Sequence, residues 1–234
     1  MPNPARRVGR AFQAAIAQVG PEDDLEIEGP SLANARRRNV FRYLCLRPCA
    51  RVGEMSAALG LSHATIRWHE KNLVENGYLE MDALHVFPND LVDSADADLF
   101  GLLSAPGRSE VLLTATRDPG VSLMELAASV GVTRQSASKL AGELVEAGLL
   151  SDVEDGRFRR LYPTDLLARK REANLPRAEA FVDRILRRLA ADGLLPELLR
   201  RDEVHAIFRF GSGTRWVILD LPTDPYATAW SSRS

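Results

Sequence analysis

The chain has 234 residues, of which 45% are hydrophobic and 26% are charged, and its formal net charge at pH 7 is −2. These proportions are typical of a soluble globular protein, and no stretch reaches the roughly 18 consecutive apolar residues of a membrane span. The first residues, MPNPARRVGRAF, carry three arginines among short apolar groups. We therefore expect no signal peptide, no membrane segment and a cytoplasmic protein.

Residues 4–19 are predicted to form an amphipathic helix within an N-terminal segment over 1–35. Its apolar side chains recur at helical spacing; they are Val8, Phe12, Ile16 and Val19. Pro4 suits the first turn of a helix. The acidic stretch EDDLEIEGP follows, and we interpret it as a linker.

The chain then repeats itself. Residues 36–79 align without a gap with residues 107–150 at an offset of 71, and 11 of the 44 pairs are identical. A match at a fixed period indicates one structural unit that is used twice. We expect two small domains, a first copy over 36–91 and a second copy over 107–166, joined by a linker over 92–106.

Each copy shows the same order of signals. An apolar helix ends at a proline turn, and a short second helix ends at Gly60 or Gly131, where a left-handed backbone is expected. Two residues later, Ser62 or Thr133 is a typical helix N-cap. The third helix carries an apolar inner face, and it ends before Gly77 or Gly148.

The period changes from helical to extended after the third helix. In the second copy, LLSDVEDGRFRRLYP predicts two strands around an Asp-Gly turn, which is a strong hairpin signal. The matching stretch of the first copy, YLEMDALHVFP, is four residues shorter. We therefore predict a mainly α fold with small β-hairpin wings, built from two tandem winged helix-turn-helix domains with helical extensions and a C-terminal β-hairpin.

In this architecture the third helix enters the DNA major groove, and its exposed side chains contact bases and phosphates. Arginine suits guanine, glutamine suits adenine, and hydroxyl groups suit either partner. The predicted DNA-binding residues of the third helices are Ser62, His63, Thr65, Arg67 and Lys71 in the first copy, and Thr133, Arg134, Gln135, Ser136, Ser138 and Lys139 in the second. The wing of the second copy adds Arg157, Arg159 and Arg160 for phosphate or minor-groove contact.

The sequences LGLSHATIRWHEKNLVENGYL and VGVTRQSASKLAGELVEAGLL resemble the helix-turn-helix signatures of winged-helix regulators of the ArsR/MarR-like kind. The combination TIRWH with a second copy is most similar to archaeal two-winged-helix transcriptional regulators. The resemblance covers a little over half of the chain. It implies binding to double-stranded DNA and a nucleoid-associated location.

Glu70 departs from this class, whose members commonly carry an apolar residue at that position. A buried, unpaired carboxylate is costly, so Glu70 is expected to be paired or turned outward. Trp68 has two interpretations: contact with a sugar or a thymine methyl group, or packing against the other copy or a partner chain. The basic run from Arg36 to Arg38 is a further candidate for phosphate contact.

The extension over 167–234 contains a second amphipathic helix, predicted over 176–191. Phe181, Ile185 and Leu189 lie on one side of it. We expect this stripe to form a homodimer surface, or to pack on the chain's own second domain or on the helix predicted over 4–19. The segment VHAIFRFGSGTRWVILDLP predicts two strands around a Gly-Ser-Gly-Thr turn. Cys45 and Cys49 are expected to be free, since the spacing of cysteines and histidines matches no zinc site.

Two alternatives to a regulator remain open from the sequence. A winged-helix protein can also be a protein–protein scaffold in a transcription or chromatin assembly. The chain can also be a regulator fused to a degenerate nucleotidyltransferase-like tail, because the motif FRFGSGT loosely resembles the Gly-Ser loop of minimal nucleotidyltransferases. Active chemistry of that kind requires paired carboxylates, and the sequence offers Asp220 and Asp224 at the wrong spacing. We therefore expect no cofactor, no metal and no catalytic residue.

Overall fold

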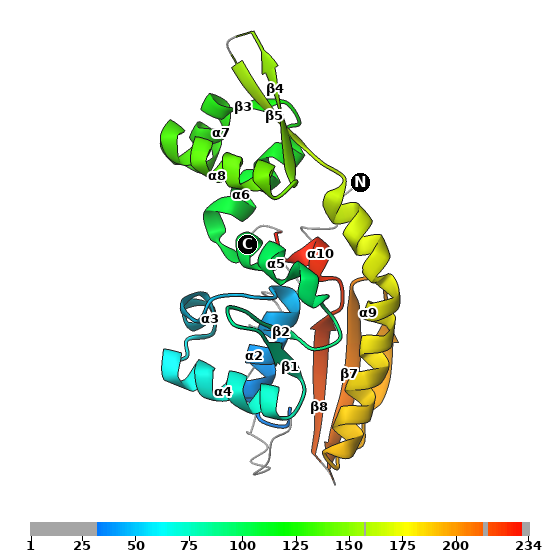
Figure 1. The fold of residues 1–234 in the computed structure, drawn as a ribbon. Helices are drawn as coiled ribbons and strands as arrows, with labels where there is room; N and C mark the ends of the chain where they lie inside the picture. Colours follow the sequence, from blue (N-terminus) through cyan, green and yellow to red (C-terminus); the bar gives the residue numbers. More distant parts are fainter. Residues whose placement is uncertain (1–31, 157, 213–214, 231–234) are drawn as a thin grey trace.

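A computed structural model describes residues 32–156, 158–212 and 215–230. Figure 1 shows how the helices and strands of these residues are arranged. The fold is mainly helical with small antiparallel sheets, as predicted. None of the helices in these ranges is both long and apolar enough to cross a membrane. The helix predicted over 4–19 lies outside the described residues.

The first copy consists of α2 (Ala35–Leu46), α3 (Val52–Leu59), α4 (His63–Glu75), β1 (Leu79–Met81) and β2 (Val86–Pro88). The two short strands pair antiparallel, with Leu79 opposite Pro88. Gly60 ends α3 at φ 65°, the left-handed conformation that the sequence predicts. This arrangement is winged-helix-like.

The second copy repeats this order with one additional strand. Its elements are α6 (Pro106–Arg117), β3 (Val121–Ser122), α7 (Leu123–Val130), α8 (Arg134–Glu146), β4 (Leu150–Asp155) and β5 (Phe158–Pro163). The sheet order is β3-β5-β4. Ser122 and Glu125 form a capping box at the start of α7, for which the S-x-x-E pattern is the sequence signature.

The turn after the first helix shows how the two copies diverged. Gly120 has φ 92° in the second copy, and the aligned residue of the first copy, Cys49, has φ 60°. A left-handed conformation is unusual for a residue with a side chain. Cys49 is buried beside Phe87 and Phe100, which makes contacts that a glycine would lack. Both Cys45 and Cys49 are free, as predicted, and both are buried. Burial raises the pKa of both thiols.

The long helix α9 (Leu166–Ala191) differs from the helix predicted over 176–191. It begins ten residues earlier and continues through Pro176, which is exposed. Proline removes one hydrogen bond from a helix interior; here the carbonyl of Glu172 that loses its donor belongs to an exposed residue. Packing of both halves of α9 on the rest of the chain outweighs the proline signal.

The prediction of a dimer surface on this helix was wrong. Phe181, Ile185 and Leu189 are fully buried within their own chain. They share a core with α2 and with a C-terminal sheet, and the rings of Phe41 and Phe181 lie 6.4 Å apart. The stripe therefore packs within its own chain, but on the first copy and the C-terminal sheet and not on the second copy, which was the intramolecular partner expected from the sequence.

The C-terminal sheet has three antiparallel strands in the order β6-β7-β8, not two. They are β6 (Glu197–Arg201), β7 (His205–Ser212) and β8 (Arg215–Pro222). Buried side chains alternate along β7, where Ala206, Phe208 and Phe210 face the core. β6 escaped prediction because all five of its residues are exposed and its sequence, ELLRR, has no alternation.

Three short elements lie between the two copies in Figure 1: η1 (Ser94–Asp96), α5 (Ala97–Ser104) and α10 (Pro225–Thr228). Phe87, Val92, Phe100, Tyr226 and Ala229 form a separate apolar cluster there with Cys49 and Ala97. A second cluster fills the second copy. The helix α5 contains the apolar run LFGLL, which the sequence indicated.

Candidate nucleic-acid interface

The third helices of the two copies begin with the same hydrogen-bonded cap. Ser62 and Thr133 both have φ −67° and ψ 153°. The hydroxyl of Ser62 accepts a hydrogen bond from the backbone N–H of Thr65 (3.1 Å), and that of Thr133 accepts one from Ser136 (3.1 Å). The Ser62 and Thr65 hydroxyls also lie 2.8 Å apart, and those of Thr133 and Ser136 lie 2.9 Å apart. These four predicted DNA-binding residues are thus engaged in starting α4 and α8.

The remaining predicted residues lie on the outer faces of these helices. Ile66, His69 and Leu73 of α4 are buried, as are Ala137 and Leu144 of α8. The side chains of His63, Arg67 and Lys71 are exposed on α4, and those of Arg134, Gln135 and Lys139 are exposed on α8, whereas Ser138 is half-buried. Both helices therefore present polar and basic groups to solvent.

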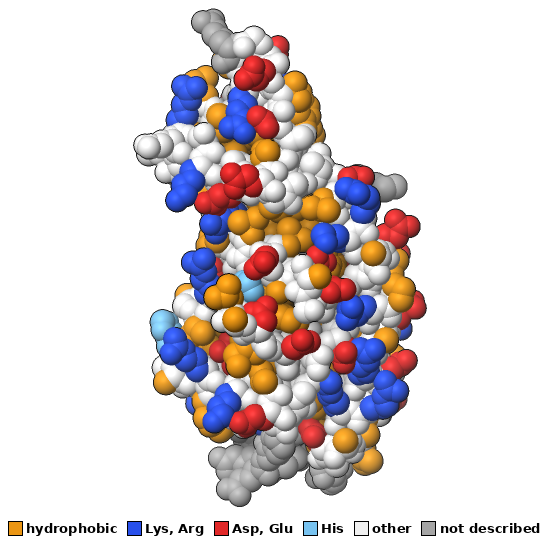
Figure 2. Space-filling view, viewed as in Figure 1, with side chains coloured by type: hydrophobic (Ala, Val, Ile, Leu, Met, Phe, Trp, Pro, Cys, Tyr) orange, Lys and Arg blue, Asp and Glu red, His pale blue; other side chains and the backbone are white. Residues whose placement is uncertain are grey.

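Both helix-turn-helix pairs lie on one side of the molecule. In Figure 1, α3 and α4 and, above them, α7 and α8 occupy the left side, whereas α9 and the C-terminal sheet occupy the right. Figure 2, in the same view, shows Lys and Arg side chains along the left side over both pairs, with Asp and Glu side chains among them; Lys and Arg also gather over α9 on the right. The outer faces of α4 and α8 thus form one candidate interface.

The three arginines that begin the first copy were candidates for phosphate contact, which requires exposed side chains. Of the three, only Arg36 is exposed. Arg37 and Arg38 are buried, with 4% and 7% of their surface exposed. The guanidinium of Arg37 lies over the ring of Trp68 (5.4 Å), and Arg38 donates hydrogen bonds to the carbonyl oxygens of Leu32 and Ala33. Arg37 and Arg38 are therefore buried in contacts within the first copy and the residues before it, and their side chains are not exposed for contact with a phosphate.

Trp68 keeps 54% of its surface exposed on α4, between the stacked Arg37 and the edge-on ring of His69 (4.9 Å). The exposed Arg67 precedes it in the chain. An exposed aromatic ring among basic groups is suited to contact with nucleic acid. The alternative of packing between the copies is excluded by this exposure.

Glu70 is buried, with 9% of its surface exposed. The aligned residue of the second copy is Ala141, which is fully buried. Burial raises the pKa of Glu70, and the nearby Arg67 opposes this rise. Of the two expected outcomes, a paired or an outward-facing side chain, the outward one does not hold, because Glu70 lies on the inner face of α4. The opposite charge near it is that of Arg67.

The arginines of the second wing are already paired. Arg159 lies 2.6 Å from Asp152, and Arg160 lies 2.7 Å from Asp155 and donates to the carbonyl oxygen of Gly120. Both ion pairs run diagonally between β4 and β5. The side chain of Arg157 lies outside the described residues. Phosphate contact at this wing thus competes with carboxylates of the same hairpin.

Arg51 is a basic residue of the candidate interface that sequence reasoning missed. It is exposed and occupies the N-cap position of α3 without a side-chain cap bond. The second copy has the capping Ser122 at this position. In helix-turn-helix complexes this helix crosses the DNA backbone. The sequence signal that would have indicated Arg51 is an arginine at a position where a capping side chain is expected.

His69 gives the first copy a measurable pH dependence. Burial, with help from Arg37 and Arg36, lowers the pKa of His69 from 6.5 to about 4. The unfolded chain therefore binds more protons between these values, so stability falls as the pH drops from 6.5 towards 4. We expect the His69 contribution to cost about 2 kcal/mol at pH 5 relative to pH 8.

The matched change is His69→Leu, because the second copy has Leu140 at this position. Urea unfolding at pH 8 and pH 5 should show a smaller loss of stability in the variant than in the wild-type protein. An equal loss in both proteins would show that other groups cause the pH dependence.

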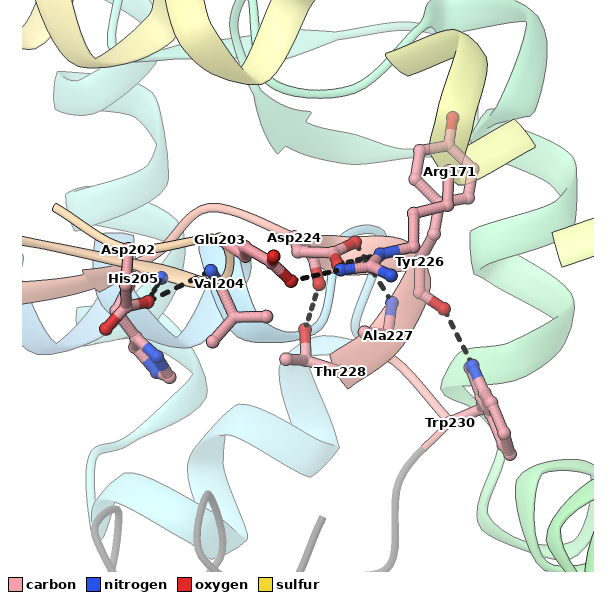
Figure 3. Close-up of polar contacts among 10 residues, drawn as sticks. All are labelled: Arg171, Asp202, Glu203, Val204, His205, Asp224, Tyr226, Ala227, Thr228 and Trp230. Atoms are coloured by element: carbon pink, nitrogen blue, oxygen red, sulfur yellow. Dashed lines mark hydrogen bonds and ion pairs between the residues drawn. The ribbon is translucent and has the colours of Figure 1, made fainter. Parts of the chain in front are cut away.

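The carboxylates required by the nucleotidyltransferase alternative do not converge. Asp220 lies 3.4 Å from Arg42 on α2, whereas Asp224 binds Arg171 on α9 and caps α10 (Figure 3). Among the described residues, no three His, Cys, Asp or Glu side chains gather in a group that could hold a metal ion. Each carboxylate has a structural arginine partner.

Residues 106–157 match the sequence model of the MarR family, so this segment is a MarR-like winged helix. Among solved structures, the PcaV transcriptional regulator from Streptomyces coelicolor is 28% identical over 37% of this chain and 66% of its own, with a TM-score of 0.26. A MarR protein from Peptoclostridium difficile is 22% identical over 40% of this chain and 63% of its own, with a TM-score of 0.29.

ScpB from Mycobacterium tuberculosis is 14% identical over 57% of this chain and 93% of its own, with a TM-score of 0.25. The chain spans just under two thirds of the PcaV and MarR chains. A search of curated proteins finds no match.

Proposed function

We propose that the chain is a DNA-binding transcriptional regulator whose two copies, 36–91 and 107–166, contact double-stranded DNA through α4 and α8. The observation that carries the proposal is the pair of identically capped helices that expose polar and basic faces on one side of the molecule. The MarR match over residues 106–157 supports it. One chain supplies two candidate contacts, so the proposal requires no second chain.

The two copies are proposed to divide the work. The second copy has Arg134 and Gln135 at the start of α8, and both side chains suit bidentate contacts with base edges. The aligned positions of the first copy are His63 and Ala64. The first copy has net charge +2 (8 basic and 6 acidic residues), whereas the second has −2 (7 basic and 9 acidic). The second copy thus reads the sequence, and the first copy binds the backbone.

The wing of the second copy is proposed to contact phosphates despite its ion pairs. The Arg159–Asp152 pair is about one third exposed on both sides, and such surface pairs contribute at most about 1 kcal/mol. A phosphate can therefore displace the carboxylate. Removing that competitor should strengthen binding to DNA of any sequence.

Two opposite changes test this wing contact. Arg159→Ala should weaken binding to all sequences and reduce the slope of log K against log salt by about 1. Asp152→Asn should raise affinity for all sequences by up to about fivefold. Titration of a labelled duplex at several salt concentrations measures both effects. Unchanged affinity in both variants would place the wing away from DNA.

A salt-titrated binding assay on genomic DNA fragments tests the proposed function itself. We expect affinity that falls steeply as salt rises, because bound cations leave the phosphates when the protein binds. The matched control is the variant Arg67→Glu with Arg134→Glu, which should not bind. A protein scaffold would give no salt-dependent DNA binding in either protein.

A further inference from the structure

The relative position of α4 and α8 depends on a small set of contacts among the segments that connect the two copies. We propose that Asp96, Lys170 and Tyr226, here called the Asp96 joint, fix the orientation of the two copies and so determine the spacing at which the chain reads DNA. The orientation is a property of the structure alone. Its consequence for spacing rests on the proposed function.

A series of ion pairs binds the segment 90–96 to α9. Asp90 lies 2.5 Å from Arg184, Asp93 lies 3.0 Å from Arg177, and Asp96 contacts Lys170. The three basic residues are seven positions apart, so they lie on the same side of α9. This segment leads from the first copy into α5 and the second copy, so the ion pairs bind the connection to α9.

Asp96 is the most enclosed member of this series, with 7% of its surface exposed. One carboxylate oxygen accepts from the Lys170 ammonium, and the other accepts from the Tyr226 hydroxyl at 2.5 Å. Burial, and then the hydrogen bond to Asp96, raise the pKa of Tyr226, so the hydroxyl retains its proton and donates. A buried carboxylate that accepts from two donors holds both of them in place, because movement of either donor would leave the negative charge poorly compensated.

The helix α10, which contains Tyr226, touches both copies. The Thr228 hydroxyl donates to the carbonyl oxygen of Leu46 at the end of α2, in the first copy. Trp230 donates to the carbonyl oxygen of Tyr226, and its ring packs against the core of the second copy. Figure 3 shows Tyr226, Thr228 and Trp230 with Asp224, which binds Arg171 and caps α10. Rotation of one copy against the other would break these contacts.

The helix α9 sets the distance between the copies in the same way. Leu166 and Leu167 at its start pack against the core of the second copy, whereas Phe181 and Ile185 lie in the core of the first. The part of the helix from Leu166 to Phe181 spans about 22 Å. With the distance fixed by α9 and the rotation fixed by the Asp96 joint, α4 and α8 are held in one geometry.

Distance measurement between spin labels tests the joint without DNA. Labels at Glu75→Cys and Glu146→Cys occupy equivalent exposed positions at the ends of α4 and α8. The native Cys45 and Cys49 are buried with raised pKa values, so they should react slowly. Wild-type protein should give one narrow distance distribution.

Two substitutions should broaden this distribution about twofold or more, since copies without a firm interface move relative to each other. They are Asp96→Ala and the milder Tyr226→Phe, which removes one hydroxyl and is expected to fold. The control Tyr162→Phe removes a hydroxyl from β5, away from the joint. Distributions as narrow as those of the control in both variants would overturn the proposal.

Binding to duplexes with two target blocks at varied separation tests the consequence for spacing. The Tyr226→Phe variant should keep the wild-type affinity for a single block. The ratio of its affinities for the preferred and the other separations should fall at least about tenfold. An unchanged preference would overturn the link between the joint and spacing. If wild-type protein bound no DNA, the proposed function would fail, while the label distances would still decide whether the joint holds the copies.

Discussion

Replacing both Arg134 and Gln135 by alanine is expected to abolish sequence preference while leaving general DNA binding in place. Each bidentate contact with a base edge discriminates by about 1–3 kcal/mol, so the double variant should lose about 2–6 kcal/mol of discrimination between target and random DNA. The phosphate contacts of the first copy and of the wing remain in this variant. Competition between target and random duplexes at fixed salt measures the loss.

The control for this experiment is Glu146→Gln, which changes an exposed residue at the far end of the same helix. It should keep the discrimination of the wild-type protein. Arg67→Ala in the first copy should weaken binding to target and random DNA alike. A double variant that still distinguished target from random DNA would show that the second copy is not the reader.

Phe181→Ala is expected to lower the free energy of unfolding by about 3–5 kcal/mol, the usual cost of removing a buried phenylalanine. Phe181 is fully buried between α2 and the C-terminal sheet, and it contacts the ring of Phe41. Urea unfolding measures the change. Leu175→Ala, on an exposed part of the same helix, should cost less than about 1 kcal/mol.

This substitution separates the two interpretations of the apolar stripe on α9. If Phe181 were part of a dimer surface, the variant would change the mass seen in sedimentation, and the stability of the single chain would change little. The structure predicts a large loss of stability of the single chain and no change in the mass seen in sedimentation. Loss of a dimer at unchanged chain stability would contradict the burial described above.

The repeat made much of the local structure predictable. Gly60 and Gly131 end their helices in the left-handed conformation, and Ser62 and Thr133 cap the next helices. These signals act within a few residues of the chain, so one sequence suffices to read them. Comparison of the copies also located the difference in wing length.

The errors concern contacts between residues far apart in the sequence. The buried partners of Phe181 come from α2 and from strands after residue 205, and an apolar stripe does not reveal whether its own chain covers it. Pro176 predicted a helix start, but packing on both sides carried the helix through it. The partners of Arg159 and Arg160 lie diagonally across a hairpin, which depends on strand register.

Only the part of the candidate interface that depends on local helical spacing was predictable from the sequence. Helical spacing placed Arg67, Arg134 and Gln135 on outer faces, where the structure also has them. It could not show that Arg37 stacks on Trp68 or that Asp96 meets both Lys170 and Tyr226. Those contacts join separate elements, and sequence periodicity carries no information about them.

The most direct test of the central claim is selection of bound duplexes from a library of random DNA sequences, with the full chain at moderate salt. The proposal that α4 and α8 contact one duplex predicts enrichment of a motif read by the second copy. It also predicts a second, weaker block at one fixed separation. Recovery of no enriched sequence, with retention that does not fall as salt rises, would contradict the claim that this surface binds DNA.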